Sequence, residues 1–457
     1  MPLQKNQVLT LQVERLSSDG SGVAHSPEGE TVFIPGAAPG DEARVRIVKD
    51  CKRYAFGILD EVLTPSPDRI PVDCAVAGPC GGCSLRHLDY AAELRAKQEN
   101  VADAFARIGG LDVPVLPIVG SPEIDRYRNK VQFPVGTDKA GRPCIGFYAG
   151  RTHRIVPCPD CRLQPGILNE IGNTLCAFFA EKGIHPYNEE TGKGLVRHIF
   201  LRRGAHSGQI MVCLVSTRAK IPSADELCTR LKEAFPDIVT ILLNVNAKNT
   251  NVILGSETHT LYGQGYIEDT LCGVPVQLGP LSFYQVNTLA AEQLYGIAAE
   301  YAQLTPDDLL LDLYCGMGTI GLSMADHCRE LVGVEIVPEA IESAKANAAR
   351  MGAAVSAKSR FFCADAGQAA AQLAAEGLHP DVVMLDPPRK GCDEATLSAV
   401  VRMAPRRVVY VSCNPATAAR DAAWLEQNGY HAEKVQPVDL FPRTKHVECV
   451  IALSNGE

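Results

Sequence analysis

The sequence predicts a doubly wound α/β domain in the C-terminal part of the chain, behind a small all-β barrel and a central mixed α/β domain. From about residue 275, buried apolar strands alternate with amphipathic helices, which is the pattern of a parallel sheet covered on both faces. Residues 1–63 alternate apolar and polar positions between turns rich in Gly, Pro, Ser and Asp, as in a small barrel. A chain of 457 residues is also too long for one ordinary core.

The N-terminal barrel is expected from short segments with a two-residue apolar period. These segments are VLTLQV, TVFIP, ARVRIV and FGILDEVL. The following stretch TPSPDRIP, residues 64–71, has three prolines in eight residues and predicts a linker. Residues 90–110 have helical periodicity and end in a Gly pair that can cap a helix.

A central domain, residues 64–265, is expected to mix strands and helices. Its clearest strands are GQIMVCLV and VTILLNVN, and helices are expected near residues 167–182 and 223–235. The helical segment at 90–118 could pack against the following domain.

The C-terminal domain, residues 266–457, has the most regular pattern. Its expected strands are DLLLDLY, ELVGVEIV, SRFFCAD, DVVMLDPP and RVVYVSCNP. Helices are expected after GMGTIG and over PEAIESAKANAARM, GQAAAQLAAEG, CDEATLSAVVRM and ATAARDAAWLEQNG. Ligands of such folds bind at the carboxyl ends of the strands, so functional residues are expected there.

Composition excludes several classes of protein. With 46% hydrophobic and 21% charged residues, and no apolar run of membrane-spanning length, the chain is expected to be globular and not embedded in a membrane. The N-terminus has no export signal, so a cytoplasmic location is expected. The 17 cysteines are therefore expected to be thiols, available for metal binding or catalysis.

The net charge of −9 argues against a uniformly basic nucleic-acid binder, but basic residues are clustered. Any one cluster would fit the solvated face of an ordinary element, whereas together they indicate a discontinuous phosphate-binding surface. The clusters are RVRIVKDCKR at 44–53, RYRNK at 126–130, RHIFLRR at 197–203 and RMAPRR at 402–407.

The glycine loop GMGTIG fits either a dinucleotide or S-adenosylmethionine. Glu335, about 20 residues beyond the glycines, could bind a ribose in both cases. Asp312 decides between them, because a carboxylate before the glycines would repel a pyrophosphate and suits a cationic ligand. Asp312, Glu335, Asp365 and Asp386 all fall at strand ends; each alone could be a helix N-cap, but together they indicate S-adenosylmethionine.

Five motifs resemble the RNA 5-methyluridine methyltransferases, the uracil-C5 enzymes that modify ribosomal and transfer RNA. The motifs are DLYCGMGTIG, GVE, LDPPRKG, VSCNP and LFPRTKHVECV. FYQVN at 283–287 is similar to a further motif of that family, and residues 1–63, with DGSGVA, resemble its TRAM barrel. The resemblance extends over essentially the whole chain. It implies that the family's cofactor contacts fall on Gln285, Tyr314, Thr319, Glu335, Asp365 and Asp386.

The same resemblance places the nucleophile on Cys413 and the general base on Glu448. Uracil C5 is a poor nucleophile, so the chemistry requires a thiolate that adds to C6 and a base that later removes the C5 proton. Cys413 ends an apolar strand and precedes a helix, where backbone N–H groups favour a thiolate. As an isolated residue, Cys413 would more often be structural and Glu448 would more often be a solvent-facing carboxylate.

A second group of cysteines has metal-binding spacing. CAVAGPCGGC contains Cys74, Cys80 and Cys83, and CPDC contains Cys158 and Cys161. Spacing alone leaves zinc and an iron–sulfur cluster equally open. The resemblance implies a [4Fe-4S] cluster held by the first three and Cys161, with Cys158 spare. A set of free structural thiols is the remaining alternative.

The expected activity is methyl transfer from S-adenosylmethionine to C5 of a uridine in RNA, acting as a monomer. The resemblance favours 23S ribosomal RNA, with transfer RNA as the alternative. Because the base must leave its stack to reach Cys413, a single-stranded or loop uridine is expected. A non-catalytic RNA-binding factor and an NAD-dependent oxidoreductase are the rival functions; the first would be expected to have lost Cys413 or Glu448.

Overall fold

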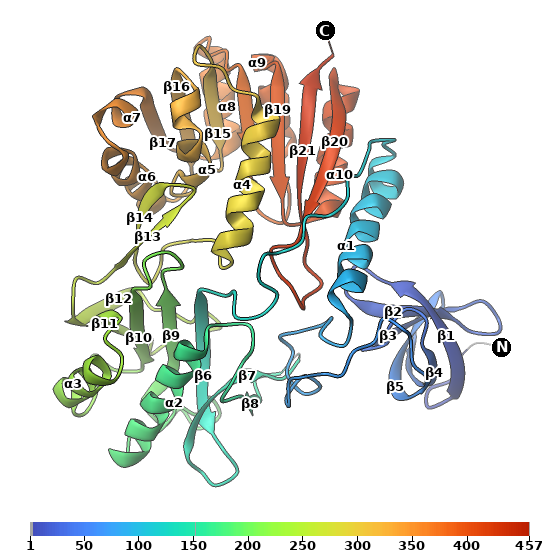
Figure 1. Cartoon of the computed structure of the whole chain (residues 1–457), viewed down its shortest axis with the longest axis vertical. Coiled ribbons are helices and arrows are strands. Elements are labelled where there is room, and N and C mark those ends of the chain that lie inside the picture. The colour runs from blue at the N-terminus through green and yellow to red at the C-terminus, as the bar shows by residue number, and fades with distance from the viewer. Residues whose placement is uncertain (1–2, 151, 457) are drawn as a thin grey trace.

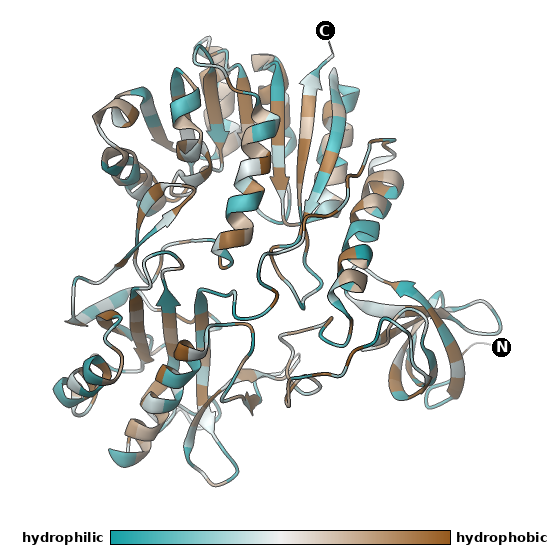
Figure 2. Ribbon diagram, viewed as in Figure 1, coloured by the Kyte–Doolittle hydropathy of each residue, from teal (hydrophilic) through white to brown (hydrophobic). Residues whose placement is uncertain are grey.

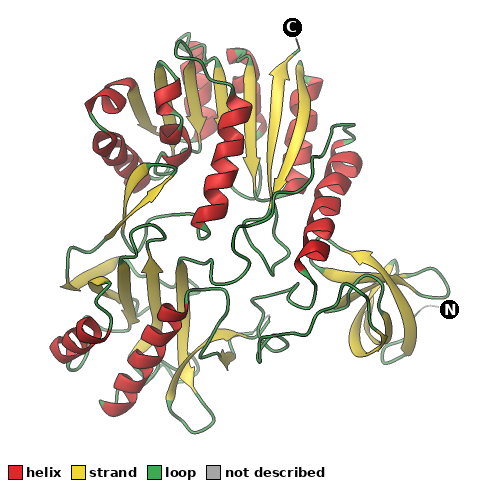
Figure 3. Cartoon of the chain, viewed as in Figure 1, coloured by secondary structure: helices red, strands yellow, loops and turns green. Residues whose placement is uncertain are grey.

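The chain folds into a small barrel, a central sheet and a C-terminal sheet that follow one another along the sequence (Figure 1). The structure is a computed structural model and describes residues 3–150 and 152–456. Helices cover both faces of the C-terminal sheet, whereas the barrel consists of strands and turns (Figure 3). No helix in these two stretches is long and apolar enough to cross a membrane.

The five N-terminal strands form a closed barrel in the order β1-β2-β3-β5-β4. Alternate residues of the strands point inward, so that Val32, Ile34 and Val45 are fully buried in its core. This confirms the predicted barrel. The strands are β1 Val8–Leu16, β2 Ser21–His25, β3 Thr31–Pro35, β4 Glu42–Asp50 and β5 Tyr54–Thr64.

Helix α1, Tyr90–Ala104, connects the barrel with the C-terminal domain and continues as a π-helical turn over Phe105–Gly109. Asp89 caps its N-terminus by accepting a hydrogen bond from the N–H of Ala92 at 2.6 Å. The helix packs against helix α10 and strand β20 of the C-terminal domain. Its Lys97 is buried between Glu93, at 2.7 Å, and Asp439, at 2.8 Å, which ties α1 to the loop that precedes Glu448.

The central domain is a seven-stranded sheet in the order β12-β11-β10-β9-β6-β7-β8, with α2 and α3 packed on it. The predicted strands and helices of this region are present. The elements are β6 Lys130–Thr137, β7 Pro143–Tyr148, β8 Ile155–Pro157, α2 Gly166–Glu181, β9 Val196–Arg203, β10 Ile210–Ser216, α3 Ala224–Ala234, β11 Ile238–Val245 and β12 Glu257–Tyr262. A hairpin, β13 Ile267–Leu271 and β14 Val274–Leu278, leads into the C-terminal domain.

The C-terminal sheet has seven strands in the order β17-β16-β15-β18-β19-β21-β20. Its strands are β15 Leu309–Leu313, β16 Glu330–Glu335, β17 Ser359–Cys363, β18 Val382–Leu385, β19 Arg407–Ser412, β20 Tyr430–Val438 and β21 Glu448–Asn455. Its helices are α4 Thr288–Ala302, α5 Thr319–Ser323, α6 Pro338–Met351, α7 Ala353–Lys358, α8 Ala366–Ala375, α9 Glu394–Met403 and α10 Pro415–Gln427, and a 3₁₀ turn covers Ala325–His327.

The inner strands β15, β16, β18 and β19 are buried on both faces and apolar, whereas the edge strand β17 is partly exposed (Figure 2). Leu310 packs with α4 and α5 on one face, while its neighbours Leu309 and Leu311 pack with α9 and α10 on the other. The continuous apolar runs in the sequence therefore serve two cores, which confirms the predicted doubly wound arrangement.

The predicted parallel sheet holds for five neighbouring strands but not for β21, which runs antiparallel to both β19 and β20. The connection from β20 to β21, residues 439–447, contains no helix, and a parallel crossover normally needs one. This difference positions the site, because the beginning of β21 lies at the edge where the parallel strands end.

Candidate functional site

The site lies at the carboxyl edge of the C-terminal sheet, where strand order reverses around β15. β15 pairs with β16 on one side and with β18 on the other, so the connections leaving these strands diverge and leave a crevice. Asp312, Glu335 and Asp386 lie at or near the ends of these three strands, as their positions in the sequence predict.

The glycine loop follows β15 and leads into α5. Gly318 has a φ of 77° at the N-cap position of α5, a left-handed conformation that favours glycine. Asp312 accepts a hydrogen bond from the N–H of Gly321 at 3.0 Å, while its other carboxylate oxygen is buried without a partner among the described residues. Burial raises the pKa of Asp312 to about 8. An orphaned buried carboxylate oxygen at this loop fits a cationic ligand better than a pyrophosphate.

Two of the predicted cofactor residues have structural partners of their own. Glu335 accepts hydrogen bonds from the N–H groups of Gly316, at 3.1 Å, and Val337, at 3.0 Å, which fixes its carboxylate beside the glycine loop. Asp365 is the N-cap of α8 and accepts a hydrogen bond from Gln368 at 3.2 Å. Helix capping, the alternative considered for all four acids, therefore applies directly to Asp365.

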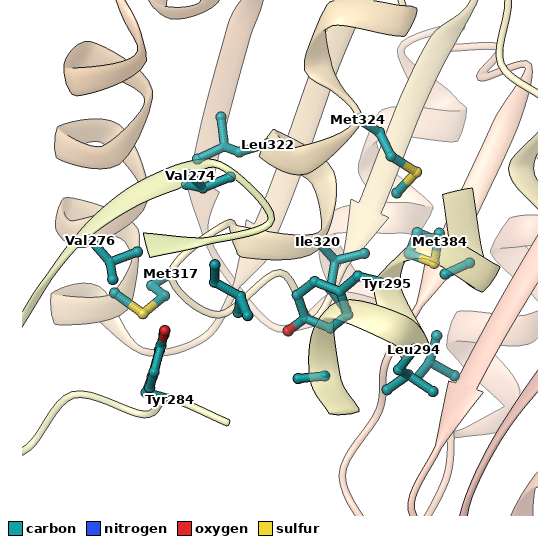
Figure 4. Close-up of a cluster of buried hydrophobic side chains, with 14 of the residues drawn as sticks. Val274, Val276, Tyr284, Leu294, Tyr295, Met317, Ile320, Leu322, Met324 and Met384 are labelled. Atoms are coloured by element: carbon teal, nitrogen blue, oxygen red, sulfur yellow. The ribbon is translucent and has the colours of Figure 1, made fainter. Parts of the chain in front are cut away.

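Tyr295, on α4, brings several predicted residues together and could not be recognised from the sequence. Its hydroxyl lies 3.3 Å from the hydroxyl of Thr319 and interacts with Gln285. It also lies close enough to Asp386 for the carboxylate to raise its pKa, although burial is the larger cause. Figure 4 shows the Tyr295 ring beside Ile320 of α5, within the apolar core. Nothing in the sequence distinguishes Tyr295 from the other apolar-face residues of α4.

The FYQVN segment is held on both sides of Gln285. Asn129 donates to the backbone carbonyl of Gln285 at 2.7 Å, and Asn287 caps α4 while its amide donates to Leu440. Tyr314 directs its hydroxyl toward Thr396, at 3.4 Å, and has a φ of 67°, a strained conformation of the kind found at functional sites.

Strand register places Cys413 opposite Glu448. Ser412, the last residue of β19, pairs with Cys449 of the antiparallel strand β21, so the next position on β19 faces the preceding position on β21. Cys413 lies one residue beyond the end of β19, and the Glu448 carboxylate is near enough to raise the pKa of its thiol. Cys413 directly precedes Asn414, the N-cap of α10, and is partly exposed, whereas Glu448 is only 6% exposed. The predicted strand end and helix start at Cys413 are both confirmed.

The electrostatics of this pair involve two further residues. Burial raises the pKa of the Cys413 thiol, and the Glu448 and Asp386 carboxylates raise it further, while Arg389 lowers it through a hydrogen bond and its positive charge. Burial and Asp386 raise the pKa of Glu448 to about 8, partly offset by Arg389. Burial also raises the pKa of Asp386 to about 7. The site therefore combines a thiol beside an arginine with buried carboxyl groups that a nearby cation would ionise.

A groove with a volume of about 710 Å³ opens at Cys413. Its lining comes from the C-terminal domain, including Arg389 and Lys445, from the barrel, including Arg15 and Phe33, and from α1 with its π-helical turn, including Arg107. We refer to this space as the interdomain groove. It gives the half-exposed nucleophile candidate access to a large ligand that also touches the barrel.

The cysteines of the second group come from two segments that are far apart in the sequence, and they line one cavity of about 280 Å³. Arg86, Arg128, Lys130 and Arg162 line the same cavity. Cys158 donates its S–H to Cys161, which raises the pKa of Cys158 and lowers that of Cys161 to about 7. No three His, Cys, Asp or Glu side chains in residues 3–150 and 152–456 are arranged to hold a metal ion. The cysteines are Cys74, Cys80, Cys83, Cys158 and Cys161.

The predicted residues thus fall into two separate sites. The cysteines of the second group line their own cavity, and the predicted cofactor and catalytic residues lie at the carboxyl edge of the C-terminal sheet. Gln285, Thr319 and Asp386 gather around Tyr295, and Asp386 also lies near Cys413 and Glu448. Glu335 holds the glycine loop, whereas Tyr314 and Asp365 interact with α9 and α8. Arg389 and Tyr295 are the site residues that sequence reasoning did not assign; the Arg in DPPR was the only available signal.

Comparison with known proteins agrees with this geometry. The family model for tRNA (uracil-5-)-methyltransferases matches residues 276–456, and the TRAM domain model matches residues 2–59. An uncharacterized RNA methyltransferase of Halalkalibacterium halodurans is 43% identical over 99% of this chain and 98% of its own length. A second, from Bacillus cereus, is 42% identical over 100% of this chain and 98% of its own length.

Among solved structures, one similar chain is the Pyrococcus abyssi tRNA (uracil-54, C5)-methyltransferase in complex with S-adenosyl-L-homocysteine. It is 28% identical, with a TM-score of 0.77 over 97% of this chain and 99% of that chain. The similarity covers the barrel, the central sheet and the C-terminal sheet together.

Proposed function

Because this chain belongs to the S-adenosylmethionine-dependent RNA uracil-C5 methyltransferase family, we propose that it methylates C5 of a uridine in 23S ribosomal RNA through a covalent bond between Cys413 and C6 of the base. The observation that carries this proposal is the register that sets Cys413 opposite Glu448 at the mouth of the interdomain groove. A nucleophile and a base on facing strand positions can act on neighbouring atoms of one flat ring.

The protein's own residues have distinct roles in this reaction. Cys413 adds to C6 of the uracil, with Arg389 favouring the thiolate. Once C5 carries the methyl group, Glu448, buried beside them, accepts the proton from C5, and the thiol leaves C6 as the C5–C6 double bond re-forms. Asp386 lies near both, and its negative charge raises their pKa values.

S-adenosylmethionine, when bound, supplies an electrophilic methyl group next to a sulfonium cation. The residues that we propose hold it are Gln285, Tyr314, Thr319, Glu335, Asp365 and Asp386, with Asp312 supporting the glycine loop. The unpartnered oxygen of Asp312 and the pKa values of Asp312 and Asp386, which burial raises, fit a ligand whose positive charge would favour the ionised carboxylates.

A test of the substrate compares cells with and without the gene by mass-spectrometric mapping of 5-methyluridine. Loss of one 5-methyluridine from 23S ribosomal RNA is expected, with restoration by the wild-type gene and not by Cys413→Ala. Loss from transfer RNA instead would favour the second candidate, the same reaction on transfer RNA, which the similarity to the P. abyssi enzyme supports. Unchanged 5-methyluridine in both RNAs would contradict the proposed activity.

We also propose that Cys74, Cys80, Cys83 and Cys161 hold a [4Fe-4S] cluster. Their common cavity and its shell of arginine and lysine side chains fit the negative charge of four thiolates around iron. Cys161 lines this cavity together with Cys74, Cys80 and Cys83, and the resemblance to the family favours it over Cys158 as the fourth ligand.

Protein purified without oxygen should therefore be brown, with about four irons per chain. Cys161→Ala should lose iron and visible absorbance, while Cys158→Ala, the matched control from the same CPDC turn, should keep both. Colourless protein with stoichiometric zinc would contradict the cluster, and loss of iron only in Cys158→Ala would mean that Cys158 is the ligand.

A further inference from the structure

Three aromatic side chains form a cluster on the outer surface of the barrel. Strands β3 and β5 pair in parallel, with Phe33 in register with Phe56. The ring centroids lie 5.7 Å apart for Phe33 and Tyr54, 5.9 Å for Phe33 and Phe56, and 5.6 Å for Tyr54 and Phe56. We call Phe33, Tyr54 and Phe56 the aromatic cluster.

The barrel core does not require this cluster. The intervening residues Val32, Ile34 and Ala55 are 0% exposed and fill the interior, so strand alternation directs the three rings outward. Tyr54 remains 41% exposed. A group of aromatic rings on the outside of a small barrel indicates a contact surface, because nothing in the fold needs it there.

The aromatic cluster adjoins the groove of the catalytic site. Phe33 and Thr31 line the interdomain groove, and Cys413 lines it from the other side. The groove's charged lining includes Arg15, Arg107, Arg389 and Lys445 against the two acids Glu99 and Asp103. Arg15 and Arg107 both form ion pairs with Asp103, at 3.1 Å and 3.3 Å, so the cations of this lining that remain available to a phosphate are chiefly Arg389 and Lys445. A ligand bound at Cys413 therefore shares one groove with these cations and with the Phe33 ring of the aromatic cluster.

We propose that the aromatic cluster is a stacking platform for an unpaired base of the same RNA strand that presents its uridine to Cys413. The proposal rests on the proposed function for the identity of the ligand. A groove that has available cations and borders an aromatic cluster has the two features that single-stranded nucleic acid requires, phosphate neutralisation and base stacking. A protein partner would not require the aromatic cluster to share a groove with Cys413.

The test measures equilibrium binding of a fluorescent uridine oligomer, about 12 nucleotides long, by anisotropy over a range of salt concentrations. Tyr54→Ala and Phe56→Ala should each weaken binding by roughly tenfold, because each removes part of a stacking surface. Their salt dependence should equal that of the wild type, because no phosphate contact is lost. Lys445→Ala should behave differently and reduce the slope by about 0.7.

Control variants separate stacking from damage to the fold. Val8→Ala removes another exposed apolar residue of the barrel, 52% exposed on β1 and outside the groove lining, and should bind RNA as the wild type does. Tyr54→Phe keeps the ring and should retain affinity. With the oligomer annealed to an adenosine complement, the Tyr54→Ala penalty should disappear, since paired bases cannot stack on the protein.

Two results would overturn the platform: aromatic variants that bind the uridine oligomer as tightly as the wild type, or a Val8→Ala variant that loses as much affinity as Tyr54→Ala. Neither depends on methyl transfer. If the aromatic variants show the stacking penalty but the protein makes no 5-methyluridine, the proposed function is contradicted and the platform stands. If the protein makes 5-methyluridine but the aromatic variants bind as tightly as the wild type, the platform is contradicted and the proposed function stands.

Discussion

RNA containing 5-fluorouridine should become covalently attached to Cys413 in the presence of S-adenosylmethionine, and Cys413→Ala should abolish both this adduct and turnover. The thiol can add to C6, but after methylation C5 carries fluorine and a methyl group and no proton. The final elimination is then blocked and the bond to Cys413 persists. A protein–RNA band on a denaturing gel, followed by mass spectrometry of the attached peptide, measures the result.

The expected loss of methylation in Cys413→Ala is at least about 1,000-fold, because none of the other residues placed at this site can saturate the ring. Cys413 is partly exposed and follows the end of β19, so the substitution should change the free energy of unfolding by about 1 kcal/mol or less. Cys228→Ala, on α3 of the central domain, is the matched control and should form the adduct normally. An adduct on Cys315 or Cys449, or methylation by Cys413→Ala, would contradict the mechanism.

Glu448→Gln should produce the second large effect, the trapping of natural RNA. Glutamine has nearly the shape of glutamate but cannot accept the C5 proton, so addition and methylation proceed while elimination stops. Turnover should fall by about 100- to 10,000-fold, and an adduct with unmodified RNA should accumulate. Wild-type protein under the same conditions should release its RNA.

The pH dependence of the two proteins should also differ. Glu448 acts as a base only when ionised, and its pKa is raised to about 8, mainly by burial. In the wild type, release of methylated RNA should therefore rise with pH, with a midpoint at about 8, because the C5 proton is removed only by the ionised form of Glu448. The residual activity of Glu448→Gln should lack this dependence. If the wild type releases methylated RNA equally fast at all pH values, this result would argue against Glu448 as the base.

Stability provides a check that Glu448→Gln remains folded. Glu448 has a raised pKa in the folded protein, so the folded state binds more protons than the unfolded state between about pH 4.5 and 8. Its contribution to stability is therefore present at low pH and is lost as pH rises through about 8. Glutamine cannot ionise, so the free energy of unfolding of the variant should fall less steeply across this window in denaturant titrations.

Local patterns were sufficient for most of the fold. The length of the apolar runs predicts β15, β18 and β19, and the helical period of apolar residues predicts the helices between them. The direction of β21 is not encoded in a local pattern, because a strand's direction depends on the connection that leads into it. That direction decides the chemistry: in the antiparallel register Glu448 lies opposite Cys413, and in a parallel one it would lie at the far edge of the sheet.

By itself, the sequence indicated the order of the domains and the glycine loop, and its motifs, through their resemblance to a known family, gave the candidate nucleophile, the candidate base and the cysteine group. Only the tertiary structure decided which residues meet. Tyr295 joins Gln285 to Thr319, Arg389 reaches Cys413, and Phe33, which lines the groove, meets Tyr54 and Phe56. Such contacts join segments far apart in the sequence, and packing and strand register create them without leaving a local pattern.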